Sequence, residues 1–227
     1  MNLDKLDNPA WYSLRETHAN FAVDYEQIKF YNPDYCTFGG ALNNEKTESG
    51  ITTYASFTDK FFVIGNRPDI NSKVRIESEL ICDQMILDRR IDLDIYENII
   101  VLQTEDQKDQ LFKLVNMVQP GYFKNKTADL GNYYGIYKND QLVAVTGERM
   151  KMDGYTELSA IVTHPEYTGK GYAKQLIVHA SNKIFNESKI PYLHVADNNV
   201  NAIRLYEKLG FVIRKKISFW KLLSNEG

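Results

Sequence analysis

The stretch from Glu157 to Ala173 constrains the fold of this chain more than any other part of its sequence. Residues 156–162 mix apolar and β-branched side chains, which predicts a strand. His164-Pro165 ends it, because proline has no N–H to donate to a sheet. Glycine or alanine then stands at positions 169, 171 and 173, and apolar residues at helical spacing follow. The segment is therefore predicted to run from a strand through a glycine-containing loop into a helix.

Such a loop suits an anion. The first N–H groups of a helix have no partner within it, and together with the helix dipole they attract negative charge. Gly169 and Gly171 lack a Cβ, which lets a phosphate approach the backbone. The spacing is neither that of a P-loop nor that of a dinucleotide fingerprint. Taken alone, ordinary turn chemistry explains this loop better than a ligand site does.

A second motif changes this balance. After a predicted strand at Tyr192–Ala196, the chain reads NAIRLYEKLGF at residues 201–211. Together with HPEYTGKGYA at residues 164–173, this motif resembles the GNAT superfamily of acyl-CoA-dependent N-acyltransferases. The resemblance runs from about Thr127 to the C-terminus, and it is strongest with the branch that includes glycine N-acyltransferase and related two-halved bacterial proteins.

The resemblance implies an α/β (α+β) fold with a mixed, mostly antiparallel twisted sheet flanked by helices. The phosphate loop of the family has Gln or Arg, then Gly after two residues, then Gly or Ala after one more. Here it falls on Thr168, Gly171 and Ala173, with threonine replacing Gln or Arg. The residues expected to bind acetyl-CoA, or another short acyl-CoA, are Ile161, Val162, Thr163, Thr168, Gly169, Lys170, Gly171, Tyr172, Ala173, Lys174 and Asn199.

The activity implied by the resemblance is transfer of an acetyl or other acyl group to a primary amine by direct attack in a ternary complex, without a metal. Tyr206 is the family's acid for the leaving thiolate; an aromatic core residue is the alternative. Asn199 is also expected to cap the following helix. A catalytically silent acyl-CoA-binding module is the rival interpretation of the chain.

Glu157 and Glu148 are the candidates for the base. If Asp153-Gly154 is a two-residue turn, Glu148 lies opposite Ser159, and both carboxylates share one face as diagonal neighbours ~7–8 Å apart. Repulsion and burial would raise the pKa of one of them, as a general base requires. Solvated charges on an exposed face are the alternative. The resemblance carries the base role onto Glu157, which leaves Glu148 as a second candidate or as an anchor for the substrate ammonium.

The N-terminal part carries no chemical motif. We expect domains at residues 1–103 and 104–227, the first being a degenerate GNAT-like α/β half that walls the acceptor cleft. Its predicted elements are a helix from Asn8 to about Ala22, a hairpin of Ile51–Phe57 and Lys60–Gly65, and a short strand at Asn98–Leu102. The apolar residues at positions 72–87 fit neither the helical nor the strand period. Thr104 and Gln107 form a capping box that opens a helix.

Composition narrows the remaining possibilities. The chain has 227 residues and a net charge of −3, without a basic block, so no nucleic-acid partner is expected. The two cysteines, Cys36 and Cys82, fit no metal spacing and indicate reduced thiols. The sequence shows neither a signal peptide nor a membrane span. We therefore expect a cytoplasmic monomer or homodimer whose amine acceptor is a small molecule, an amino acid or a protein N-terminus.

Overall fold

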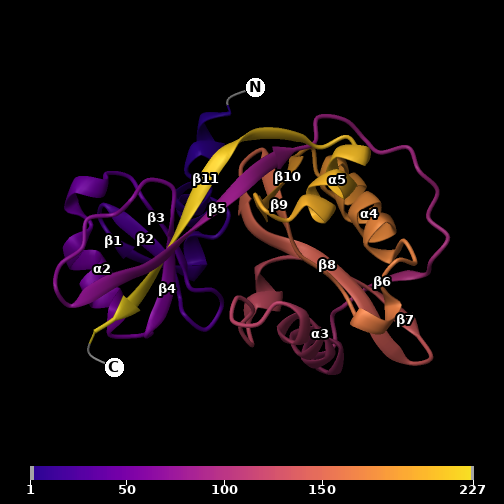
Figure 1. Cartoon of the computed structure of the whole chain (residues 1–227), viewed down its shortest axis with the longest axis horizontal. Helices are drawn as coiled ribbons and strands as arrows, with labels where there is room; N and C mark the ends of the chain where they lie inside the picture. Colours follow the sequence, from indigo (N-terminus) through magenta and orange to yellow (C-terminus); the bar gives the residue numbers. More distant parts are fainter. Residues whose placement is uncertain (1–2, 226–227) are drawn as a thin grey trace.

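The computed structural model describes residues 3–225, and the strands in this part of the chain form one sheet (Figure 1). Their order across the sheet is β1-β2-β3-β4-β11-β5-β10-β9-β8-β7-β6. The strands are β1 (Ala22–Tyr25), β2 (Ile28–Tyr31), β3 (Phe38–Ala41), β4 (Lys60–Ile64), β5 (Val74–Ile86), β6 (Ile99–Val101), β7 (Tyr133–Lys138), β8 (Gln141–Met152), β9 (Tyr155–Thr163), β10 (Ile190–Ala196) and β11 (Val212–Ser224). The α-helices are α1 (Pro9–Arg15), α2 (Glu48–Ala55), α3 (Glu105–Val118), α4 (Tyr172–Asn186) and α5 (Val200–Lys208).

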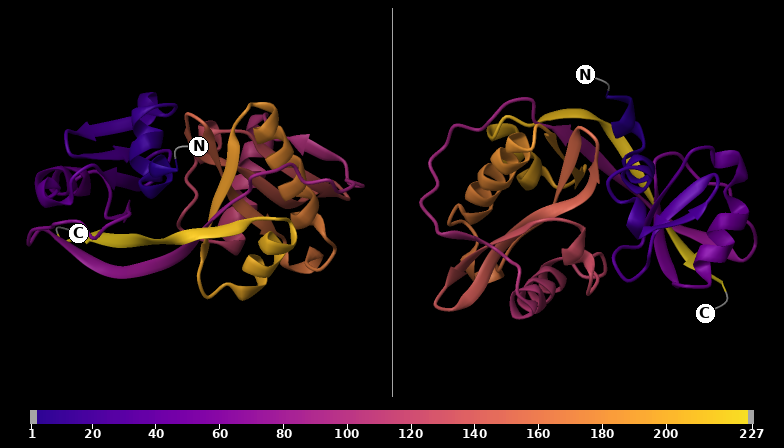
Figure 2. Two further views of the ribbon diagram at one scale, coloured as in Figure 1. Left: turned by 90° about the horizontal axis from the view of Figure 1, so that it is seen from above. Right: turned by 180° about the vertical axis from the view of Figure 1, so that it is seen from behind.

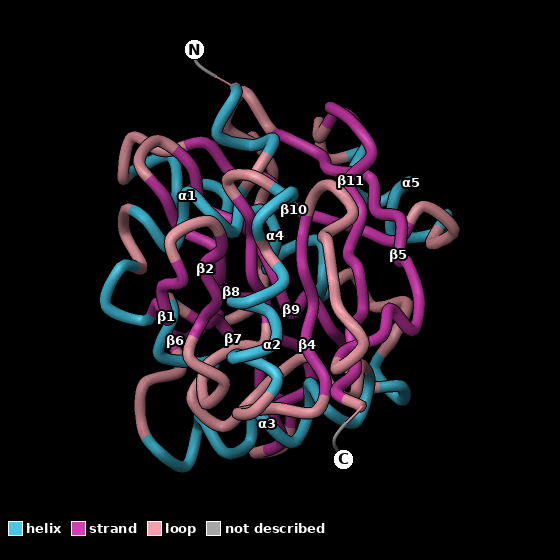
Figure 3. Tube along the Cα trace, turned by 90° about the vertical axis from the view of Figure 1, so that its left-hand side faces the viewer, coloured by secondary structure: helices cyan, strands magenta, loops and turns pink. Residues whose placement is uncertain are grey.

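The molecule has an N-terminal lobe, which contains β1–β4, and a C-terminal lobe, which contains β6–β10. Two long strands join them. β5 and β11 pair antiparallel and pass from one lobe into the other (Figures 1 and 2). β11 also pairs with β4, and β5 also pairs with β10. β11 thus runs beside strands of both lobes, and Figure 3 views it from the N-terminal lobe. The sheet is continuous across residue 103, and the treatment of residues 1–103 and 104–227 as two domains stays a prediction.

Three strands of the C-terminal lobe form an antiparallel meander. β7, β8 and β9 pair antiparallel, and the first turn holds Asn139 and Asp140 at φ 49° and 60°, as a two-residue hairpin turn requires. Consecutive residues alternate between the faces of β7: Tyr134 packs in the cluster that includes α4, and Tyr133 packs in the cluster that includes α3. The two helices therefore cover opposite faces of the sheet, and the capping box of Thr104 and Gln107 opens α3 as predicted.

The N-terminal lobe corrects two predictions and resolves one ambiguous stretch. The expected strand at Ile51–Phe57 is wrong, because Glu48–Ala55 is helix α2. Its buried Ile51, Tyr54 and Ala55 stand at helical spacing, and the Tyr54 ring stacks on Phe30 with 4.0 Å between centroids. The first helix ends at Arg15 instead of continuing to about Ala22, and the ambiguous stretch at residues 72–87 contains the single strand β5.

Two further properties of the described chain bear on function. No helix within residues 3–225 has the length and apolar character that crossing a bilayer would require. Over the same residues, no three His, Cys, Asp or Glu side chains come together as metal ligands. Cys36 and Cys82 are both buried and free.

The sharing of β5 and β11 between the two lobes predicts how a fragment behaves. Residues 104–227 expressed alone lack β4 and β5, so both neighbours of β11 and one neighbour of β10 are missing. We expect this fragment to lack cooperative unfolding in urea and dispersed amide signals in NMR, and coexpression with residues 1–103 to restore both. A fragment that unfolds cooperatively by itself would contradict this prediction.

Candidate functional site

The site lies where β9 and β10 separate. The two strands pair in parallel at only three positions, from Ile190 opposite Tyr155 to Tyr192 opposite Glu157. Beyond Glu157, β9 stays paired with β8, whereas β10 stays paired with β5 as far as Ala196. The edge of β9 that faces β10 therefore has free backbone groups from about residue 159 onward, among the described residues. A ligand that occupies this gap can complete the hydrogen bonding of the strand.

A bulge in β9 lies at this gap. Gly147 pairs with Ser159 and Val145 with Val162, so two residues of β9 stand opposite one residue of β8. Ala160 has φ 49°, a conformation that non-glycine residues seldom adopt. Bulges of this kind redirect side chains next to functional sites. The bulge is on the strand whose free edge borders the gap.

A cavity of about 390 Å³ opens at the separation. Side chains of both lobes line it: Phe38, Leu80, Cys82 and Phe219 come from β3, β5 and β11, and Arg149, Leu158 and His194 come from β8, β9 and β10. Of the predicted site residues, Ile161, Asn199 and Tyr206 line it, whereas Glu148, Glu157 and the loop of residues 168–174 do not.

The glycine loop has the geometry expected of an anion site. Gly169 and Gly171 have φ 75° and 78°, and a Cβ added to either would meet no atom within 4 Å. Within the described chain, the first backbone N–H after the loop that donates to a backbone carbonyl is that of Gln175, so the N–H groups of residues 169–174 are left without backbone partners. They precede or open α4, a helix of 15 residues. Open space and unpaired donors at a helix N-terminus fit a phosphate group.

The side chains around this loop contribute less to the anion site than its backbone N–H groups do. Thr168 donates its hydroxyl hydrogen to the carbonyl of Pro165 at 3.1 Å, so it makes a local turn contact. Lys170 and Lys174 are exposed, and the Lys170 ammonium lies over the ring of Tyr167. Asn199 caps α5 as predicted, by accepting a hydrogen bond from the N–H of Ala202 at 3.3 Å.

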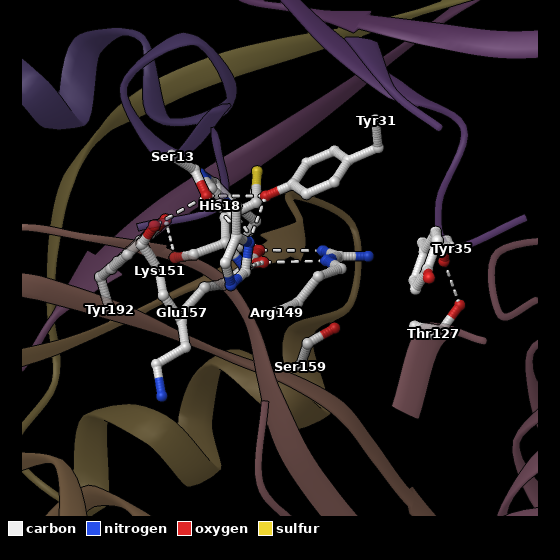
Figure 4. A network of polar contacts seen from close by, with 12 residues as sticks. Ser13, His18, Tyr31, Tyr35, Thr127, Arg149, Lys151, Glu157, Ser159 and Tyr192 are labelled. Atoms are coloured by element: carbon white, nitrogen blue, oxygen red, sulfur yellow. Dashed lines mark hydrogen bonds and ion pairs between the residues drawn. The ribbon is translucent and has the colours of Figure 1, made fainter. Parts of the chain in front are cut away.

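Glu157 is the most heavily bonded side chain near the cavity (Figure 4). Its carboxylate accepts four hydrogen bonds: two from Arg149 at 2.9 Å, one from the N–H of Met150 at 3.3 Å and one from Nδ1 of His194 at 2.8 Å. Burial alone would raise the pKa of Glu157, but Arg149 and His194 outweigh burial and hold it at about 2. The expectation of a raised pKa is therefore wrong for Glu157.

The predicted shared face is also wrong. Glu148 lies opposite Leu158 instead of Ser159, because a bulge between Glu148 and Lys151 adds one residue to β8. Glu148 consequently has other partners: it accepts a hydrogen bond from the Lys151 ammonium at 2.7 Å. The same bulge places Arg149 beside Glu157.

His194 completes a buried polar chain. Nδ1 faces Glu157, and Nε2 lies 3.0 Å from the amide nitrogen of Gln84. The amide nitrogen is a donor, so the network assigns the proton of His194 to Nδ1 and makes Nε2 the acceptor. Gln84 also donates to the carbonyl of Leu6 at 2.8 Å, which fixes its orientation. Arg149 and Gln84 belong to no sequence motif, so neither was predicted to have a role.

Two further groups line the cavity. Tyr206 is 7% exposed, and burial raises the pKa of its hydroxyl to about 12. Cys82 was not expected near the site; burial raises the pKa of its thiol to about 12, so it is a weak nucleophile at neutral pH. Tyr206 therefore offers a proton at neutral pH, and Cys82 offers no thiolate.

Comparisons with known proteins bear on this arrangement. A family model described as FR47-like protein matches residues 133–220. A spermidine N(1)-acetyltransferase from Vibrio cholerae is 51% identical over 55 residues, which are 23% of this chain and 31% of that protein. The chain thus matches less than a third of the length of this curated relative.

Solved structures match most of the chain. A candidate acetyltransferase of the GNAT family from Novosphingobium aromaticivorans superposes with a TM-score of 0.88 at 27% identity, covering 97% of this chain and 98% of that one. A GCN5-related N-acetyltransferase from Kribbella flavida superposes with a TM-score of 0.60 at 12% identity, covering 91% and 90%. These findings confirm the predicted fold class. The narrower likeness to the glycine N-acyltransferase branch is not among what they support.

The open space at Gly171 makes a direct prediction for the ligand expected there. Gly171→Ala places a methyl group where a phosphate would approach. We expect calorimetric titration to show binding of coenzyme A weakened about tenfold or more, equivalent to the loss of one charge-assisted hydrogen bond. Gly154→Ala is the matched control, since Gly154 has φ 86° and equally open space in the β8–β9 turn. Equal affinity for coenzyme A in the two variants would refute a phosphate site at Gly171.

Proposed function

We propose that this chain, which has the fold of the GNAT acetyltransferases and matches a family model over residues 133–220, transfers an acetyl group from acetyl-CoA to an amine. The observation that carries the proposal is the joint presence of the β9–β10 gap, the cavity behind it and the glycine loop at the N-terminus of α4. Acetyl-CoA would supply the thioester, an acyl group already activated for attack by an amine.

The residues present fit such a co-substrate. The free N–H groups of residues 169–174 would hold its pyrophosphate, with Lys170 and Lys174 close in sequence to add positive charge. The free edge of Ile161–Thr163 would pair with the amide groups of its pantetheine arm. Asn199 lines the cavity from the start of α5. Holding the thioester in the cavity would place it beside the amine, which supplies the proximity that acyl transfer needs.

Tyr206 is proposed as the acid. Its raised pKa keeps the hydroxyl protonated at neutral pH, so it can donate to the sulfur of the departing thiolate. The rival function, a silent acyl-CoA-binding module, needs no acid, and Tyr206 would then serve only in the core. Release of free thiol in the presence of amines separates the two functions.

Glu157 is proposed as a positioning residue rather than as the base. A carboxylate with a pKa of about 2 that already accepts four hydrogen bonds removes a proton poorly. It holds Arg149 and His194 at the cavity wall. Glu148 is completely buried, is ion-paired with Lys151 and does not line the cavity, so it is not placed to meet the amine. We therefore propose that the acceptor enters as the neutral amine.

The acid role predicts the effect of one hydroxyl. Tyr206→Phe should lower kcat by about 10²–10⁴-fold while leaving the affinity for acetyl-CoA nearly unchanged. Thiol release and calorimetry measure the two quantities. Tyr137→Phe is the control, because Tyr137 has a buried hydroxyl without a hydrogen-bond partner within the described chain and lies outside the cavity lining. Wild-type turnover of Tyr206→Phe with chemistry limiting would leave Tyr206 as a core residue.

The absence of a strong base predicts the pH dependence. If the neutral amine is the substrate, kcat/KM should rise about tenfold per pH unit up to the pKa of each acceptor and then level off. Two acceptors of different pKa should therefore give two different plateaus, and Glu157→Gln should scale both profiles without changing their shape. A rise near pH 6–7 that is common to all acceptors and lost in Glu157→Gln would instead make Glu157 the base.

A further inference from the structure

We propose that Arg149 selects acceptors that carry a carboxylate beside the reactive amine and an apolar body. This inference rests on the proposed acetyl transfer and concerns the acceptor side of the same cavity. Arg149 belongs to none of the motifs that predicted the site, and its position follows from the bulge that adds one residue to β8.

The guanidinium of Arg149 is only partly used by the protein. Nε and Nη2 each donate one hydrogen bond to Glu157. Arginine has five N–H donors, so two hydrogens on Nη1 and one on Nη2 remain. Within the described chain, no hydrogen bond from Nη1 is formed, and Figure 4 shows this end of the group directed away from Glu157. The remaining hydrogens form the fork that binds a carboxylate through two parallel bonds.

The protein fixes this fork rigidly. Arg149 packs its guanidinium over the ring of Phe38, 4.5 Å from the ring centroid, while Glu157 holds the opposite edge. The side chain is 13% exposed and lines the cavity, so the free edge meets the cavity rather than bulk solvent. Little conformational freedom remains to be lost when a ligand binds, which favours affinity.

The charges around the cavity disfavour acceptors that carry several positive charges. Arg149 is the charged side chain of its described lining, and no Asp or Glu lies in that lining. The nearest buried carboxylate, Glu157, is turned toward Arg149 and His194. A polyamine needs carboxylates to replace the hydration of its ammonium groups, and this cavity offers none.

Aromatic side chains form much of the remaining wall. Phe38, Phe123 and Phe219 line the cavity, and the Phe38 and Phe219 rings meet edge to face with 5.7 Å between centroids. Such a wall stabilises an apolar side chain. An α-amino acid with an apolar side chain combines the amine, the carboxylate and the apolar body that the wall, the fork and the reaction require.

A matched acceptor series tests this inference. Phenylalanine, phenylalaninamide and phenethylamine share the apolar body but differ in the carboxylate, and spermidine represents the polyamines. Initial rates of thiol release should be compared at equal concentrations of unprotonated amine. We expect kcat/KM for phenylalanine to exceed that for each other acceptor by about 10- to 100-fold, the range of a charge-assisted bidentate contact. Calorimetric titration of the same acceptors into the CoA-saturated protein should give the same order.

Two variants assign the preference to Arg149. Arg149→Lys keeps the charge and removes the fork. The double variant Arg149→Gln with Glu157→Gln removes both charges, so no buried carboxylate is left unpaired. In each, the ratio of phenylalanine to phenethylamine, in both kcat/KM and affinity, should fall about 10- to 100-fold. Arg15→Lys, at an exposed position on α1, should leave the ratio unchanged.

The outcomes separate the two proposals. If phenethylamine or spermidine is acetylated as well as phenylalanine, the selection by Arg149 is refuted while acetyl transfer stands. If the protein binds CoA but acetylates no acceptor, acetyl transfer to amines is refuted, and the calorimetric order alone decides whether Arg149 binds carboxylates. An unchanged acceptor ratio in folded Arg149→Lys would refute the role of the fork.

Discussion

The buried carboxylate of Glu157 holds three strands together at the point where the sheet opens. It lies on β9, is bonded to Arg149 and Met150 of β8, and is bonded to His194 of β10. Pairing of β9 with β10 stops at this residue. An ion pair that is fully hydrogen-bonded can be retained in a core because removing one partner would leave an unpaired buried charge. The width of the gap, the wall of the cavity and the direction of Arg149 all depend on this one contact.

The second constraint is the shared use of β5 and β11 by both lobes. The cavity wall opposite β9 comes from β3, β5 and β11, so the N-terminal lobe contributes surface that the C-terminal lobe cannot supply. Phe219 lines the cavity from β11 and contacts the rings of both Phe38 and His194. The part of the chain without a chemical motif therefore belongs to the same structural unit as the loop that carries one.

Local patterns predicted the elements whose determinants lie close together in sequence. The capping box at Thr104 and the helix after Gly171 were both confirmed, since each depends on a few neighbouring residues. The helix at Glu48–Ala55 was missed because a short apolar run fits both periods, and contacts with β2 and β4 decide between them.

The site was harder to predict than the fold. The glycine loop and Tyr206 belong to motifs and were identified, although their roles stay predictions. The register between β8 and β9 was predicted wrongly at Glu148, because a bulge shows no pattern in the sequence and one added residue moves Glu148 from Ser159 to Leu158. That one residue turned an expected pair of carboxylates into an arginine–carboxylate pair. It also reversed the expected direction of the Glu157 pKa.

The central position of β11 has a consequence for synthesis on the ribosome. Domains generally fold from the N-terminus as the chain emerges, but β4 and β5 are neighbours in the sheet only through β11, whose residues are 212–224. Until those residues emerge, both strands keep an unpaired edge that can join another nascent chain. We expect this protein to depend on chaperones during translation more than a domain of its size with sequential strand order does.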